Sequence, residues 1–191
     1  MEFGGGGLPE ELLIHQCSPT MAGLKTGNLF SYKYDDKNEL NKSVRSFNIK
    51  YSSKGVRLIP LKAENGHALM YMYRPKRLKE DLKDKKACEI LSECSYRTDN
   101  ASKCVAKLAK RLRTSVEFPH EIGLFLGYPS EDVDGFIRNK AMCSKCVGTW
   151  KVYGDEEEAI RRFKQFKKCL SVYEQAYNRQ KSFERLIVGF R

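Results

Sequence analysis

Three side chains of this sequence have the types that nucleophilic catalysis needs, namely Cys17, His120 and Glu121. Cys17 directly precedes a Ser-Pro pair that favours a helix start, and a thiol near a helix N-terminus ionises more easily and becomes nucleophilic. His120 is a candidate general base, with His15 as an alternative, and Glu121 is a candidate for orienting the imidazole. The alternative interpretation is a small buried cysteine and a histidine that caps a helix.

A second group is the C-x-x-C sequence of Cys143 and Cys146, which suits a zinc ion held by two thiolates or a redox dithiol. No second C-x-x-C or H-x-x-x-H supplies further zinc ligands at finger spacing. The alternative is that these cysteines have no chemical role, and we expect no cofactor. Four further thiols lie at irregular intervals: Cys88, Cys94, Cys104 and Cys169.

Several reaction classes lack their signature. The chain contains no G-x-x-x-x-G-K-[ST], G-x-G-x-x-G, G-x-S-x-G or H-E-x-x-H sequence. Nucleotide hydrolysis by a P-loop, dinucleotide chemistry, a serine elbow and the common zinc peptidase are therefore unsupported. His120-Glu121 has Leu124, not histidine, four positions after His120.

Basic side chains gather in three parts of the chain and are candidates for binding nucleic acid or a protein partner. On helices they can form a surface that follows phosphates, with Tyr71, Tyr73 and Tyr96 as candidate stacking groups. The alternative is a solvated face balanced by acids. The candidate binding residues are Arg74, Lys76, Arg77, Lys103, Lys107, Lys110, Arg111, Arg161, Arg162, Lys164 and Lys168.

Bulk properties agree with a globular protein that meets polyanions. The 191 residues carry a formal net charge of +11, which attracts nucleic acid, anionic membranes or acidic partners. No apolar run is long enough to cross a membrane, so we expect no membrane association. Seven cysteines without an export signal indicate reduced thiols and a cytoplasmic location. The oligomeric state stays open.

The first half of the chain should hold two helices and a hairpin. The residue pattern predicts a flexible Gly-rich leader over residues 1–9, a helix over 19–26 ended by Gly27, and a helix over 38–46. Two apolar runs, 55–61 and 67–73, flank an Asn-Gly pair that is typical of a hairpin turn.

The second half should be mostly helical. We expect helices over 75–85, 86–113, 118–127 and from Pro129, a strand over 149–153, a long helix to about Asn178 and a strand over 186–190. With no repeat or long linker, these elements predict one α+β domain over residues 10–191, a small mostly antiparallel sheet packed by several helices.

The segments 17–30 (CSPTMAGLKTGNLF), 118–129 (FPHEIGLFLGYP) and 150–155 (WKVYGD) resemble the hallmark segments of a family of uncharacterised proteins from anaerobic Gram-positive bacteria. Tyr73-Arg74-Pro75-Lys76 fits as well. The resemblance implies a domain of unknown function, so it transfers no catalytic residue. The Gly-rich leader and the complete C-x-x-C do not belong to that family's pattern.

These observations favour a non-enzymatic basic protein that binds nucleic acid or a nucleoprotein. Because small proteins of this kind can reside on phages or plasmids, one specific hypothesis is an inhibitor of a host nuclease, such as an anti-CRISPR protein. The alternatives are a cysteine-dependent enzyme using Cys17 with His120 and Glu121, and a thiol metal or redox accessory protein using Cys143 and Cys146.

Overall fold

The computed structural model describes residues 7–180 and 182–189. The described residues form two compact units: unit 1 contains residues 7–74, 168–180 and 182–189, and unit 2 contains residues 75–167. Of the expected leader, residues 1–6 lie outside the described part. Leu8 packs against the core of unit 1. The single-domain boundaries at 10–191 stay a prediction.

Unit 1 begins with helix α1 (Glu10–Met21), which replaces the shorter helix expected over 19–26. That expectation was wrong because Leu13, Cys17 and Met21 recur at helical spacing and are buried together, which extends the helix upstream of Pro19. Pro19 lies in the last turn and has no amide to donate to the carbonyl four residues earlier, so it removes one bond close to the end of the helix. Gly23, with φ +76, takes the left-handed conformation after the helix.

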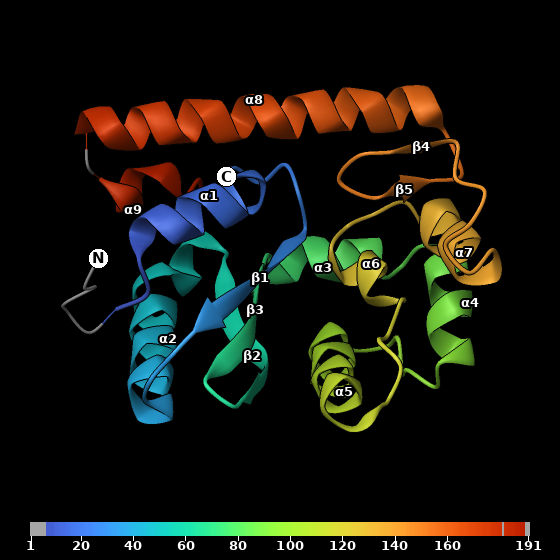
Figure 1. The fold of residues 1–191 in the computed structure, drawn as a ribbon, viewed down its shortest axis with the longest axis horizontal. Coiled ribbons are helices and arrows are strands. Elements are labelled where there is room, and N and C mark those ends of the chain that lie inside the picture. The colour runs from blue at the N-terminus through green and yellow to red at the C-terminus, as the bar shows by residue number, and fades with distance from the viewer. Residues whose placement is uncertain (1–6, 181, 190–191) are drawn as a thin grey trace. The chain divides into compact units, whose positions relative to one another are not determined.

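Gly27, expected to end that first helix, instead begins a three-stranded antiparallel sheet. Its strands β1 (Gly27–Lys33), β3 (His67–Tyr73) and β2 (Arg57–Glu64) lie side by side in that order (Figure 1). Asn65 and Gly66 both have positive φ values, 50° and 73°, so the expected Asn-Gly hairpin turn is confirmed.

One face of this sheet forms the core of unit 1. Phe30, Leu58 and Met70 point into that core, together with buried side chains of α1. Helix α2 (Lys37–Tyr51), longer than the predicted 38–46, adds an apolar face and is followed by the short helix η1 (Ser52–Lys54). Helix α9 (Phe183–Leu186) adds Phe183. A strand over 186–190 is wrong for residues 186–189, and residue 190 lies outside the described part.

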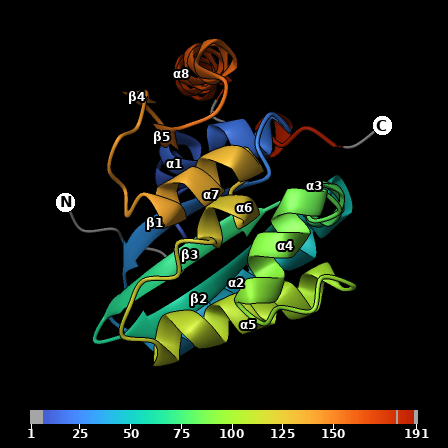
Figure 2. The same ribbon diagram turned by 90° about the vertical axis from the view of Figure 1, so that its right-hand side faces the viewer.

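Unit 2 consists of short helices and one small hairpin. Its helices are α3 (Pro75–Asp81), α4 (Lys85–Glu93), α5 (Ala101–Thr114), α6 (Ile122–Phe125) and α7 (Ser130–Arg138). The helix expected over 86–113 is interrupted, because Ser95 adopts a positive φ and Asn100 caps a new helix at the Lys103 amide. Helices α4 and α6 both pack against α7 (Figure 2).

The hairpin of unit 2 pairs β4 (Cys146–Val147) with β5 (Lys151–Val152). The strand expected over 149–153 is thus real but shorter, with a turn before it. Helix α8 (Glu156–Gln180) follows, as predicted for the longest helix, and includes residues of both units. The expected class, α+β with a small antiparallel sheet packed by helices, is confirmed. None of the described helices has the length and apolar character needed to cross a membrane.

Candidate functional site

Cys17, the candidate nucleophile, lies inside α1 and not at a helix N-terminus. Its side chain is fully buried, and burial raises the pKa of the thiol. Cys17 belongs to unit 1, whereas His120 and Glu121 belong to unit 2. The alternative base, His15, is exposed and contacts Glu174 at 3.0 Å. The geometry around Cys17 is that of a small packed side chain.

We expect Cys17 to be alkylated far more slowly than Cys143 in the folded protein at neutral pH. Cys143 is exposed, whereas Cys17 is buried and its raised pKa keeps the thiolate fraction low. Iodoacetamide labelling followed by peptide mass spectrometry measures both rates. Cys143→Ser should remove the fastest reaction, and denaturant should expose Cys17. Labelling of Cys17 at the rate of Cys143 would revive the cysteine-enzyme alternative.

Glu121 has a structural environment in unit 2. Its buried carboxylate accepts a hydrogen bond from the Tyr96 hydroxyl at 2.8 Å and pairs with the Arg111 guanidinium, Nε to Oε1 2.8 Å. The ring of His120 is exposed and lies 5.0 Å, between centroids, from that of Phe136. The carboxylate expected to orient an imidazole is therefore engaged by Tyr96 and Arg111.

Cys143 and Cys146 lie before and within strand β4. Cys143 is exposed and Cys146 is half-buried; desolvation and the Glu156 carboxylate raise the pKa of the Cys146 thiol. Within residues 7–180 and 182–189, no three or more His, Cys, Asp or Glu side chains are arranged to hold a metal ion.

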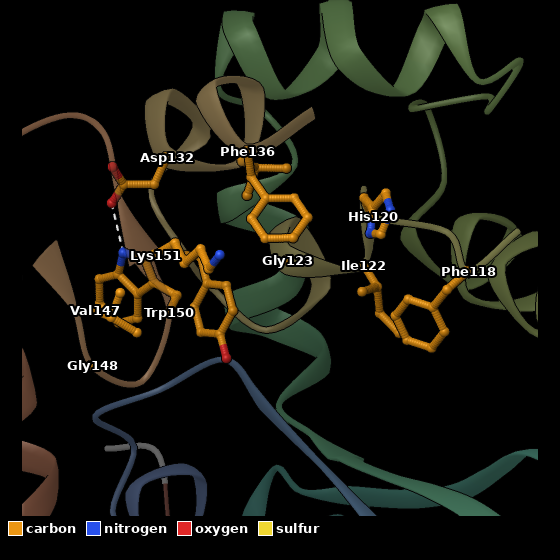
Figure 3. A pocket seen from close by; sticks show the side chains of 12 residues that line it. Phe118, His120, Ile122, Gly123, Asp132, Phe136, Val147, Gly148, Trp150 and Lys151 are labelled. Carbon is orange, nitrogen blue, oxygen red and sulfur yellow. Dashed lines mark hydrogen bonds between the residues drawn. The ribbon is translucent and has the colours of Figure 1, made fainter. Parts of the chain in front are cut away.

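Unit 2 has a mainly apolar pocket of about 280 Å³ that is built by two of the family-like segments. Residues of 118–128 form one side and residues of the β4–β5 hairpin form another, while α7 closes it (Figure 3). Its lining is mainly apolar, with the Tyr128 phenol and the side chains of His120, Asp132 and Lys151 as the ionisable groups among the described residues. The large apolar side chains are Phe118, Ile122, Tyr128, Phe136, Val147 and Trp150.

Asp132 holds the pocket together from α7. Its buried carboxylate accepts hydrogen bonds from the Trp150 indole at 2.6 Å and from the backbone amides of Tyr153 and Gly154 at 2.6 and 2.7 Å. Figure 3 shows the bond to Trp150 as a dashed line. Both oxygens are used, so this carboxylate fixes the hairpin against the helix.

Small and aromatic residues set the shape of the pocket. A Cβ atom on Gly123 would lie 2.8 Å from the Val133 side chain, so only glycine lets α6 approach α7 this closely. The rings of Tyr128 and Trp150 stack at 4.8 Å between centroids. Burial raises the pKa of Tyr128 to about 12, which marks this wall as apolar.

Helix α5 carries the second candidate surface. Cys104, Leu108 and Leu112 are buried on one side, and the helix holds no acidic residue. Its basic residues are Lys103, Lys107, Lys110, Arg111 and Arg113. Of these, Lys103, Lys110 and Arg113 are exposed, Lys107 donates to the Ser95 carbonyl, and Arg111 pairs with Glu121.

The other predicted binding residues differ in exposure and pairing. Arg161 and Arg162 both pair with Glu158 on α8, so the three side chains together carry less positive charge than the two arginines alone. Three of the remaining residues are exposed and one, Arg77, is half-buried: Lys76, Arg77, Lys164 and Lys168.

Arg74 is a buried residue of unit 1 and is unsuited to contact phosphates. Only 1% of it is exposed, and its guanidinium donates to the carbonyls of Thr20, Met21 and Val188 at 2.5 to 2.7 Å. Assigning it to a binding surface was wrong because the sequence does not show that three chain segments converge on it. Lys25 is likewise buried, and burial lowers its pKa to about 8.

Together, these features define a basic α+β protein with an aromatic pocket and a cationic helix, whose predicted nucleophile is buried. The chain belongs to the family described as "Protein of unknown function (DUF3793)", whose model matches residues 13–187. The resemblance to a family of unknown function is thereby confirmed, while its hallmark segments and bacterial origin stay predictions. No curated protein and no solved structure matches the chain.

Proposed function

We propose that this protein binds double-stranded nucleic acid without sequence preference, through the cationic side of α5. The observation that carries the proposal is the charge of that helix. Five of its 14 residues are basic and none is acidic. A surface of this kind binds the phosphate backbone and releases condensed counterions.

The charge of unit 2 is concentrated on this one helix. Residues 75–167 include 20 Lys and Arg and 15 Asp and Glu side chains. Because α5 holds five of the basic side chains and none of the acidic ones, the rest of the unit is balanced at 15 of each. The excess is therefore local, which distinguishes it from a generally solvated basic surface.

The cations of α5 also form an ordered row. Lys103, Lys107 and Lys110 are spaced by four and three residues, which places them on one side of the helix, opposite the buried side. Seven residues of helix span about 10 Å, a length over which a duplex presents several phosphates. Such a row can follow a phosphate backbone.

The aromatic residues favour a duplex over a single strand as the partner. Tyr71, Tyr73 and Tyr96, the expected stacking groups, are 0%, 7% and 5% exposed. Their rings are covered, so they do not offer a face to an unpaired base, whereas single-strand binding gains much of its energy from such stacking. Phosphate contacts alone suffice for duplex binding.

A triple variant, Lys103→Gln, Lys110→Gln and Arg113→Gln, tests the proposal. All three side chains are exposed, so the fold should tolerate the change. We expect micromolar binding of a labelled DNA duplex by the unmodified protein at about 100 mM salt, and roughly 100-fold weaker binding by the variant. Fluorescence anisotropy measures both affinities.

A matched control removes the same charge from unit 1, with Lys33→Gln, Lys37→Gln and Arg45→Gln at three exposed positions. This control should keep at least a third of the affinity of the unmodified protein. Equal losses in the two triple variants would mean that net charge alone governs binding, and the α5 surface would be rejected. Failure of the unmodified protein to bind would reject the function itself.

A further inference from the structure

We infer that the apolar pocket beside Trp150 in unit 2 binds a small organic ligand, an aromatic or otherwise apolar carboxylate. The pocket shares no lining residue with α5, so this inference is independent of nucleic-acid binding. A volume of about 280 Å³ is near the lower end for ligand pockets, which suits a molecule of one ring and a short chain.

The apolar walls of the pocket are incompletely covered by the chain itself. Phe118 and Val147 line it and are 51% and 69% exposed. Exposed side chains of this size that surround a cavity are typical of a surface that a ligand covers. Trp150 and Phe136 supply flat aromatic faces at the inner side (Figure 3), against which a ring can stack.

The polar groups of the pocket favour a negative charge on the ligand. Asp132 is the acid of the lining, and its two oxygens already accept three hydrogen bonds. Lys151 lines the same space from β5; among the described residues, the Ala141 carbonyl takes one of its three N–H groups, at 2.7 Å. A carboxylate can accept from the remaining N–H groups.

His120 supplies a second donor on the other side of the pocket. Figure 3 shows its ring across the cavity from Lys151, with Phe136 between them. An imidazole donates from at least one nitrogen in either protonation state. The pocket thus combines apolar walls with two groups that recognise an anion. Asp132, the one acid among its described lining residues, is already engaged in holding Trp150 and the hairpin.

The single tryptophan of the chain makes this inference directly measurable. Trp150 lines the pocket and is the only Trp among 191 residues, so its fluorescence reports on this site. We would titrate the protein with 3-phenylpropionate, its neutral amide and 3-phenylpropylamine. The acid should change Trp150 emission with a Kd on the order of 100 µM, and the amide and amine should bind at least about tenfold more weakly.

Two variants and a control separate the contributions of charge and apolar contact. Lys151→Met should weaken the acid by about 10- to 100-fold and the amide much less, because the amide carries no charge for the ammonium to attract. The bond from Lys151 to the Ala141 carbonyl is lost equally for both ligands. Phe136→Ala should weaken both ligands. Lys145→Met is the matched control, since Lys145 is an exposed lysine of the same region that donates to the Gly154 carbonyl and does not line the pocket.

Three results would overturn the inference. The first is that none of the three compounds changes Trp150 emission up to about 10 mM. The second is that the acid, the amide and the amine bind with equal affinity. The third is that Lys151→Met and Lys145→Met affect binding of the acid equally. Thermal unfolding of each variant shows that it is folded. If Lys151→Met fails to fold, His120→Gln replaces it, with a weaker but still acid-specific loss expected.

Discussion

Replacing Asp132 with Ala is expected to lower the free energy of unfolding by about 3–5 kcal/mol. The change removes the acceptor of three hydrogen bonds and leaves the Trp150 indole N–H and two backbone amides without their partner in a buried setting. Asp132→Asn should cost about 2 kcal/mol, because its amide retains one acceptor oxygen but places a donor against a donor. Urea unfolding followed by far-UV circular dichroism measures both.

Trp150 provides a local readout of the same change. Losing the bond from the indole should release the β4–β5 hairpin and shift Trp150 emission to longer wavelength, because only 8% of this residue is now exposed. The matched control is Glu131→Gln, the exposed neighbour, which should change stability by less than about 0.5 kcal/mol. Equal stability of the two variants would contradict the role of Asp132.

The second large effect concerns Arg74 in unit 1. Arg74→Met should lower the free energy of unfolding by about 4 kcal/mol, because it removes the donor to carbonyls at the end of α1, at Lys54 and at Val188. Arg74→Lys should cost about 2–3 kcal/mol, since an ammonium cannot reproduce the planar fork that reaches several segments at once. Urea unfolding measures the losses.

Lys76→Met is the control for Arg74→Met. It also removes one positive charge, from an exposed residue close to Arg74 in the sequence. It should unfold at nearly the same urea concentration as the unmodified protein. If folded Arg74→Met instead kept its stability and lost DNA binding, Arg74 would be a binding residue, as the sequence alone suggested, and its structural role would be contradicted.

Elements with strong local signals could be predicted from the sequence. The Asn-Gly turn at 65–66 and the long helix from Glu156 have residue patterns that need no distant partner. The start of α1 was missed because Ser18-Pro19 resembles a helix start, while the buried face that extends the helix upstream depends on the sheet and α2. The packing of α1 against the rest of unit 1, and not the local Ser18-Pro19 signal, therefore determines where the helix begins.

The pocket could not have been found from residue types alone. Asp132 looked like an ordinary acid in the first turn of a helix, although its partners lie about 20 positions later in the chain. One signal was available: the segments 118–129 and 150–155, which carry the family resemblance, form two of the pocket walls.

The basic residues illustrate a similar limit. Sequence clustering treats Arg74, Arg111 and Lys110 alike, yet the first is buried, the second pairs with Glu121 and the third is exposed. Burial and pairing depend on segments distant in the chain. The nuclease-inhibitor hypothesis stays a prediction, because it rests on where such proteins reside and not on a particular residue.

If the exposed cations of α5 contact phosphates, the salt dependence of duplex binding must change when they are removed. Each phosphate contact contributes about 0.9 to the slope of log affinity against log salt concentration. The slope for the unmodified protein should therefore be steeper by about 2.7 than that of the Lys103, Lys110 and Arg113 triple variant. The unit 1 control should keep the steeper slope. Identical slopes for all three proteins would contradict contact between α5 and phosphates.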